Sequence, residues 1–244
     1  MFRVLRPLPL DSLRLLVFDL DGTLIDSRQD LCNSVNATLG HFGMRHLPDA
    51  TIAGFIGDGA AMLIRRALAV PGEVLPGNDT EDEGFFEEAF RYFLTWYRAH
   101  KLDFTYVYPG VLESLEVLRT LPDGSPRPMA VLTNKPVRPA RAICEALGLA
   151  PYFLAIYGGD TFPTKKPDPL GLATLMAETG AAPEETAMIG DSDVDIRTAR
   201  NAGAWAVGCS FGLAPESLEA VVPDAVVDHA SDWSALFAGA SIRL

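Results

Sequence analysis

The sequence predicts an α/β protein whose parallel sheet is interrupted, after its first strand, by an inserted block of helices. Short apolar runs alternate with segments of helical spacing over most of the chain, which is typical of a parallel sheet with covered faces. The alternation stops after about Ser27 and restarts at Pro109-Gly110. We therefore expect a core domain of residues 1–26 and 109–244, and an inserted domain of residues 27–108.

The core strands are predicted from apolar runs of strand length. These runs are Leu13–Phe18, Met129–Leu132, Phe153–Tyr157, Ala187–Ile189, Trp205–Val207 and Ala225–Val227. Between them, Val111–Leu121 places its leucines on one helical face, and Pro139–Leu147 also has helical spacing. Strands that alternate with helices in this way imply one parallel sheet with covered faces.

The inserted block has the pattern of consecutive helices, with no convincing strand between Ser27 and Tyr108. Helical spacing is found at Gln29–Phe42, Asp58–Ala69 and Glu83–Ala99. Gly72–Glu83 is rich in glycine, proline and acidic residues, which predicts a loop.

Composition limits the possible partners. The formal net charge of −12 over 244 residues argues against nucleic acid or an anionic membrane surface as the main partner. No stretch approaches the roughly 18 consecutive apolar residues of a membrane span, and the N-terminal segment does not have the pattern of a signal peptide. Cys32, Cys144 and Cys209 are scattered and odd in number, which favours a reducing compartment and offers no zinc site. We expect a cytoplasmic protein that is a monomer or a homodimer.

Polar side chains follow three of the predicted strands. Asp19 and Asp21 come directly after the first, Thr133-Asn134-Lys135 after the second, and Asp191 begins a run of acids after the fourth. Ligands of open parallel sheets bind beyond the carboxyl ends of the strands, so these clusters are expected to converge. Acids at the end of a core strand are costly unless they hold a cation or carry out chemistry.

Each cluster also has a simpler reading. A calcium loop starting at Asp19 would need glycine at its sixth position, where Leu24 stands. Thr133 and Asn134 are also common in helix caps and turns. Lys166, between prolines, could be a solvated loop lysine, and acids such as Asp191 are favoured at any helix start. Only the joint arrangement of the clusters favours a functional site.

Four segments in this order resemble the signature motifs of one family. They are Phe18–Leu24, Leu132–Lys135, Lys166–Pro169 and Gly190–Ile196. The chain resembles the haloacid dehalogenase-type superfamily of Mg²⁺-dependent phosphatases with an aspartate nucleophile, and within it the phosphoglycolate phosphatase-like branch. The resemblance extends from about Leu15 to Trp233. It implies a doubly wound, Rossmann-like core with an all-helical cap domain.

The resemblance also implies catalytic roles. Asp19 would be the nucleophile that accepts the phosphoryl group. Asp21 would be the general acid that protonates the leaving alkoxide, and then the base that activates water. Thr133, with backbone N–H groups around Asn134, would bind a phosphoryl oxygen. Lys166 would bridge the nucleophile and the phosphate.

The same family pattern implies a Mg²⁺ site. Asp19 and Asp191 would supply carboxylates to the metal, and Asp21 would supply its backbone carbonyl. Asp195 would support either the metal or Lys166. Mg²⁺ prefers oxygen ligands and retains waters, so this set is sufficient. The metal and Lys166 would provide the positive field that the acidic chain otherwise lacks.

In the predicted cap, Gly54–Gly59 resembles the specificity loop of the family, and Gly57 would allow close approach of a small ligand. Arg65 is a candidate partner for a substrate carboxylate, although Arg65 and Arg66 could equally be solvated helix residues. The intact Asp21 argues against a dehalogenase. A Schiff-base lysine early in the cap, as a phosphonatase needs, is absent, since Lys101 lies at the far end.

We therefore expect a phosphatase of a small phosphate ester, with 2-phosphoglycolate favoured over a sugar phosphate or pyrophosphate. The alternative of a different class is a phospho-accepting signalling or binding protein without turnover. Receiver-type modules share clustered aspartates and a lysine, but they are about half this length and have no helical insertion.

Overall fold

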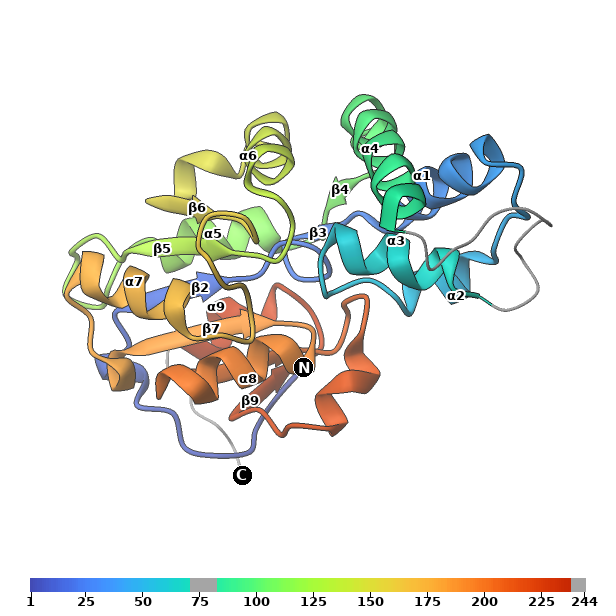
Figure 1. Ribbon diagram of the computed structural model, residues 1–244. Helices are drawn as coiled ribbons and strands as arrows, with labels where there is room; N and C mark the ends of the chain where they lie inside the picture. Colours follow the sequence, from blue (N-terminus) through green and yellow to red (C-terminus); the bar gives the residue numbers. More distant parts are fainter. Residues whose placement is uncertain (71–82, 238–244) are drawn as a thin grey trace. The chain divides into compact units, whose positions relative to one another are not determined.

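The computed structural model describes residues 1–70 and 83–237 (Figure 1). The chain forms two compact units. One unit comprises Met1–Asp26 and Val107–Leu244, and we call it the core unit; the other is Ser27–Tyr106, which we call the insertion unit. Each is described by itself below.

The core unit contains a seven-stranded sheet with the strand order β1-β9-β8-β7-β2-β5-β6. Its strands are β1 (Phe2–Val4), β2 (Leu15–Phe18), β5 (Met129–Leu132), β6 (Ala155–Tyr157), β7 (Thr186–Gly190), β8 (Trp205–Cys209) and β9 (Ala225–Val227). β1 pairs antiparallel with β9, and all the other pairs are parallel. After β2, the chain adds β5 and β6 on one side of β2, and then β7, β8 and β9 on the other side. The gap between β2 and β7 is therefore the topological switch point of the sheet.

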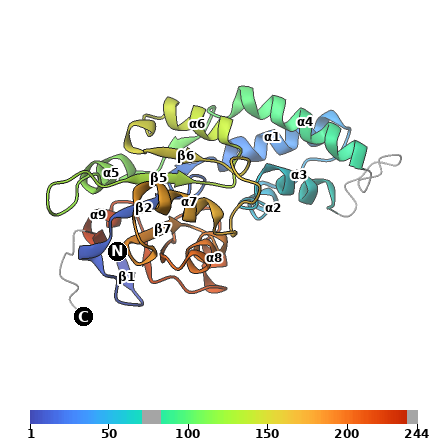
Figure 2. The ribbon, with the colours of Figure 1, turned by 60° about the vertical axis from the view of Figure 1, so that its left-hand side comes forward.

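Helices cover both faces of this sheet (Figures 1 and 2). They are α5 (Val111–Leu118), α6 (Val137–Ala146), α7 (Leu170–Thr179), α8 (Asp193–Ala202) and α9 (Asp232–Phe237). Short 3₁₀ helices lie at Leu10–Ser12, Ala150–Tyr152, Pro183–Glu185 and Pro215–Glu219. Successive residues of β2 alternate between the faces: Leu16 and Phe18 pack with α5, α6 and α9, whereas Leu15 and Val17 pack with α7 and α8. This burial on both sides explains why β2 reads as a continuous apolar run.

The insertion unit is helical and has its own apolar core. Its helices are α1 (Arg28–His41), α2 (Asp49–Ala53), α3 (Ala60–Leu68) and α4 (Glu83–His100). Leu39, Ile52, Ile64 and Phe93 are among its fully buried side chains. Strands β3 (Ile25–Asp26) and β4 (Tyr106–Val107), where the chain passes from one unit to the other, pair in a two-stranded sheet.

The buried carboxylate of Asp30 holds together the two ends of the insertion unit. Asp30 Oδ2 accepts hydrogen bonds from the backbone N–H and the hydroxyl of Thr105, at 2.8 and 2.6 Å. The backbone N–H of Phe104 also donates to this carboxylate, at 3.0 Å. The first turn of α1 is thereby tied to the segment that follows α4.

The predicted α/β class with a helical insertion is confirmed, and the differences are local. β1 has only three residues, with Arg3 in its middle, and its antiparallel pairing with β9 has no signal in the local sequence. The five-residue α2 is too short to show a helical period. The expectation of no strand before Tyr108 was wrong for the two-residue β4. The loop predicted at Gly72–Glu83 falls outside the described residues, apart from Glu83, which begins α4.

Candidate active site

The carboxyl ends of β2, β5 and β7 place three polar clusters at one edge of the core sheet. β2 lies between β5 and β7, with Phe18 opposite Val131 on one side and Ile189 on the other. Because all three strands are parallel, the residues that follow them emerge at the same edge. Asp19, Thr133 and Asp191 each occupy such a position, as the sequence predicts.

Asp19 is buried and lies beside a buried lysine. The Nζ atom of Lys166 is 2.8 Å from Asp19 Oδ1 and 2.6 Å from Asp195 Oδ1, and the Lys166 side chain is only 3% exposed. One ammonium group therefore serves two carboxylates that are far apart in the sequence. Burial by itself lowers the pKa of Lys166, but the charges of Asp19 and Asp195 outweigh it and raise the pKa, so the lysine stays protonated.

Asp195 is positioned by the start of α8. Its Oδ2 atom accepts hydrogen bonds from the backbone N–H of Ser192, at 3.1 Å, and from the Ser192 hydroxyl, at 2.7 Å. Ser192 and Asp195 thus form a capping box at the helix N-terminus. Gly190 lets this carboxylate come close, because a Cβ atom there would lie 2.1 Å from Asp195 Cγ. The carboxylate is held by the helix start, with its Oδ1 directed to Lys166.

Backbone N–H groups of the loop after β8 hold the carboxylate of Asp191. Its Oδ2 atom accepts hydrogen bonds from the N–H groups of Leu213 and Ala214, at 2.7 and 3.1 Å, in the loop after β8. The loop can approach only because residue 212 is glycine: a Cβ atom there would lie 2.2 Å from Asp191 Cβ. Gly22, which adopts φ +86°, approaches the same carboxylate, because a Cβ atom there would lie 2.2 Å from Asp191 Oδ2.

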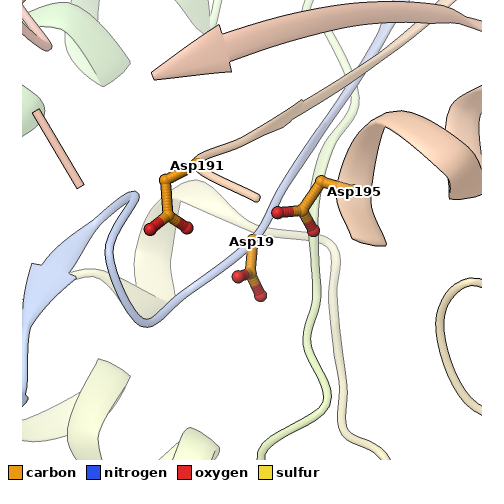
Figure 3. A group of neighbouring side chains, drawn as sticks. All are labelled: Asp19, Asp191 and Asp195. Atoms are coloured by element: carbon orange, nitrogen blue, oxygen red, sulfur yellow. The ribbon is translucent and has the colours of Figure 1, made fainter. Parts of the chain in front are cut away.

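One oxygen of each of Asp19, Asp191 and Asp195 lies within 4.8 Å of the others, and all three residues are buried (Figure 3). Burial, with the charges of its two neighbours, raises the pKa of Asp191 to about 8. Burial also raises the pKa of Asp19 to about 6, although Lys166 acts in the opposite direction. Both shifts arise mainly from burial, which disfavours the charged form of each carboxylate.

The carboxylate of Asp21 points to a different lysine. Lys135 Nζ donates to both Asp21 oxygens, each at 3.0 Å. The ammonium groups of Lys135 and Lys166 therefore contact the carboxylates of Asp19, Asp21 and Asp195, and the carboxylate of Asp191 lies beside those of Asp19 and Asp195. With all four aspartates and both lysines ionised, the set carries a formal charge of −2, which a divalent cation would balance.

Thr133 and Asn134 organise the loop after β5. Thr133 Oγ1 accepts a hydrogen bond from the backbone N–H of Lys135 at 3.2 Å, and Asn134 Nδ2 donates to the Lys166 carbonyl at 3.1 Å. Thr133 and Lys166 also line one small pocket of the core unit, together with Gly158 and Gly159. The structure thus brings the second and third predicted motifs into contact.

Gly57 and Arg65 belong to the insertion unit. Gly57 lies between α2 and α3 with φ +122°, a conformation that favours glycine. The guanidinium of Arg65 pairs with Glu83 at 2.6 Å and lies 3.7 Å from the centre of the Phe86 ring. Both of these partners are in the same unit, so the substrate-binding role of Gly57 and Arg65 stays a prediction.

Two features of the site were missed from the sequence. No role was assigned to Lys135, although it stands within the second motif, and the backbone of Leu213 and Ala214 carried no polar signal. For that loop, the only available indication was a glycine shortly after a predicted core strand, at Gly212. Its contact with Asp191 depends on tertiary packing alone.

The core unit has a doubly wound sheet with a carboxylate–lysine cluster at its switch point, and a helical unit is inserted after β2. This arrangement is that of a class of α/β hydrolases. The chain belongs to the haloacid dehalogenase-like hydrolase family, whose model matches residues 16–209. The family predicted from the four motifs is confirmed.

Relatives and solved structures agree with this assignment. A phosphoglycolate phosphatase of Chromobacterium violaceum is 40% identical over 209 residues, which cover 85% of this chain and 90% of that protein. The protein of the same name from Rhodospirillum rubrum is 36% identical over 220 residues, covering 89% of each chain. A crystal structure of a predicted phosphoglycolate phosphatase from Haemophilus somnus superposes with a TM-score of 0.82 at 30% identity, covering 91% of this chain and 96% of that one.

Proposed function

We propose that the protein is a phosphomonoester hydrolase that works through an aspartyl-phosphate intermediate on Asp19. The observation that carries this proposal is the geometry around Lys166, whose ammonium group lies within 2.8 Å of Asp19 and is fixed by Asp195. Phosphoryl transfer depends mainly on positioning and on neutralising charge at the equatorial oxygens. A buried lysine beside a nucleophilic carboxylate meets both requirements.

We propose Mg²⁺ as the cofactor, held by Asp19, Asp191 and the backbone carbonyl of Asp21. The residues present fit such an ion, because three buried carboxylates lie within 4.8 Å of one another and outnumber their cationic partners. Oxygen donors of this kind favour a hard divalent cation. When bound, Mg²⁺ would neutralise charge on the phosphoryl group and on the carboxylates around it.

The chain's own residues can account for both half-reactions. In the first, an Asp19 oxygen forms a bond to phosphorus while the bond to the ester oxygen breaks, and Asp21 donates a proton to the leaving alkoxide. In the second, Asp21 takes a proton from a water molecule that attacks phosphorus and releases Asp19. Lys166 and Thr133 hold the phosphoryl oxygens in place during both steps.

We propose 2-phosphoglycolate as the substrate, supported by relatives that carry the name phosphoglycolate phosphatase. This ligand has a phosphate and a carboxylate on two carbons, so it needs a second cationic contact besides Lys166. Arg65 is the candidate for that contact, and substrate would have to compete with Glu83 for its guanidinium. We propose that the insertion unit acts as a cap that excludes water from the aspartyl phosphate.

A specificity screen tests this function. Purified protein is incubated with 2-phosphoglycolate, hexose phosphates and pyrophosphate, with and without Mg²⁺, and Asp19→Asn serves as the inactive control. We expect Mg²⁺-dependent release of phosphate with the highest kcat/KM for 2-phosphoglycolate. A phosphosugar preferred by more than about tenfold, roughly 1.4 kcal/mol, would overturn the substrate assignment. Stable phosphorylation of Asp19 without turnover would instead support the signalling alternative.

Cellular location and assembly stay predictions. In residues 1–70 and 83–237, no helix is both long and apolar enough to cross a membrane. Cys32, Cys144 and Cys209 are all buried, and we propose a cytoplasmic location for the protein. We also propose a monomer or a homodimer that does not bind nucleic acid.

A further inference from the structure

Lys135 makes a symmetrical contact with the carboxylate of Asp21. Its Nζ atom lies 3.0 Å from both oxygens, and the side chains of Lys135 and Asp21 are only 4% and 14% exposed. A lysine that donates to both oxygens restricts rotation of the carboxylate about its last bond. Because a buried ammonium group is costly without a partner, this contact is expected to persist in the folded protein.

Lys135 is itself held in place through its backbone. Its N–H group donates to Thr133 Oγ1 at 3.2 Å, and its carbonyl accepts a hydrogen bond from the N–H of Gly159 at 2.9 Å. The next turn is fixed by Asp160, whose Oδ1 accepts from the N–H of Val137 at 2.7 Å. The loop after β6 therefore supports the loop that carries Lys135.

Glycines make this support possible. A Cβ atom at Gly158 would lie 2.6 Å from the Lys135 carbonyl oxygen and 2.3 Å from Val137 N. A Cβ atom at Gly159 would lie 2.5 Å from the Asn134 carbonyl oxygen. Because backbone is packed this closely against backbone, the loop has little room to move, and the backbone position from which the Lys135 side chain extends is well defined.

Each lysine of the site contacts one of the two aspartates that follow β2. Lys166 contacts Asp19 and Asp195, whereas Lys135 contacts Asp21. Asp21 is only two residues from Asp19, yet each of the two aspartates after β2 has its own lysine, drawn from a different loop. This division indicates that Lys135 acts on the proton-transferring group rather than on the nucleophile.

We propose that Lys135 is a positioning residue that holds the Asp21 carboxylate in the orientation required for proton transfer in both half-reactions. This inference rests on the proposed function, because it assumes that Asp21 is the acid and base. It differs from that function in assigning a task to a residue that does not need to touch the substrate.

Kinetics of four proteins test the inference: wild type, Lys135→Met, Asp21→Asn and the double variant. We expect Lys135→Met to lower kcat by about 100-fold, the scale of a misplacement by about 1 Å, with KM changed less than about threefold. Lys135→Arg, which keeps the charge, is expected to recover part of the loss. In the Asp21→Asn background, Lys135→Met should cost less than about threefold further, because its target is already inactive. Lys101→Met is the matched control, since Lys101 lies in the insertion unit and its Nζ donates to the backbone carbonyl of Arg98, at 3.0 Å.

Losses of kcat that multiply in the double variant, or a raised KM with unchanged kcat, would mean that Lys135 binds the phosphate directly, and would overturn the inference.

A second measurement does not depend on turnover. Urea unfolding of the same four proteins in EDTA should show coupling of at least about tenfold in the unfolding equilibrium constant between residues 135 and 21. Additive effects would refute the contact. Absence of any turnover by wild-type protein would refute the proposed function. The coupling measured by unfolding would still show whether Lys135 and Asp21 are in contact.

Discussion

Replacement of Lys166 by methionine tests the central contact of the site. The ammonium group of Lys166 is shared by Asp19 and Asp195, at 2.8 and 2.6 Å, and its side chain is 3% exposed. Methionine keeps much of the lysine stem but removes the charge, so two buried carboxylates lose their common cation. Breaking a buried ion pair by removing one partner costs about 3–5 kcal/mol. We expect Lys166→Met to lower the free energy of unfolding of the metal-free core unit by about this amount.

The assay is urea denaturation in EDTA, followed by tryptophan fluorescence. A Trp96→Phe background removes the tryptophan of the insertion unit, so that the signal comes from Trp205 and Trp233 in the core unit. The companion variant Asp195→Asn removes one of the two carboxylates. Combined with Lys166→Met, it should regain at least about 1 kcal/mol relative to the sum of the single changes. A loss below about 1 kcal/mol for Lys166→Met, or strict additivity, would refute the reasoning.

The remaining predictions concern the metal site, the nucleophile and the insertion unit. The pKa of Asp191 is raised from 3.8 to about 8, so the folded protein binds a proton that the unfolded chain has released. In EDTA this contribution to stability is fully present below about pH 4 and is lost as the pH rises to about 8, with a slope of up to about 1.4 kcal/mol per pH unit. Urea midpoints across this range should fall less steeply in Asp191→Asn, and parallel curves would contradict the shift. Asp19→Asn is expected to abolish both turnover and the single-turnover burst, whereas Asp21→Asn should slow both half-reactions. Rapid-quench kinetics with labelled substrate distinguish these two outcomes. Asp30→Asn replaces a buried acceptor of three N–H and O–H donors and is expected to cost about 1–3 kcal/mol, seen as a lower Tm. Its control Asp103→Asn alters an exposed contact with His100 and should cost under about 0.5 kcal/mol. Equal costs for the two variants would refute the idea that Asp30 ties the start of α1 to the segment after α4.

Local sequence was sufficient for the elements that carry the chemistry. β2 is fully buried on both faces, so its apolar run is unambiguous, and the polar residues after it stand out against that run. The same contrast marks Thr133 after β5 and Asp191 after β7. Parallel pairing then brings these ends together without further information, which is why the convergence was predictable. β1 and α2 were not predictable, because elements of three and five residues have too few positions to show a period.

The sequence by itself therefore determined the class of fold, the insertion and the aspartates at the strand ends, since each follows from the spacing of apolar and polar residues along the chain. Only the tertiary structure decided which cation serves which carboxylate. Lys135 and Lys166 stand far from Asp21 and Asp19 in the chain, and either lysine could have served either acid. The choice depends on where Gly158 and Gly159 let two loops touch, and on how α8 directs Asp195 to Lys166. Such contacts arise from close packing of backbone against backbone, for which the linear spacing of residues carries no signal.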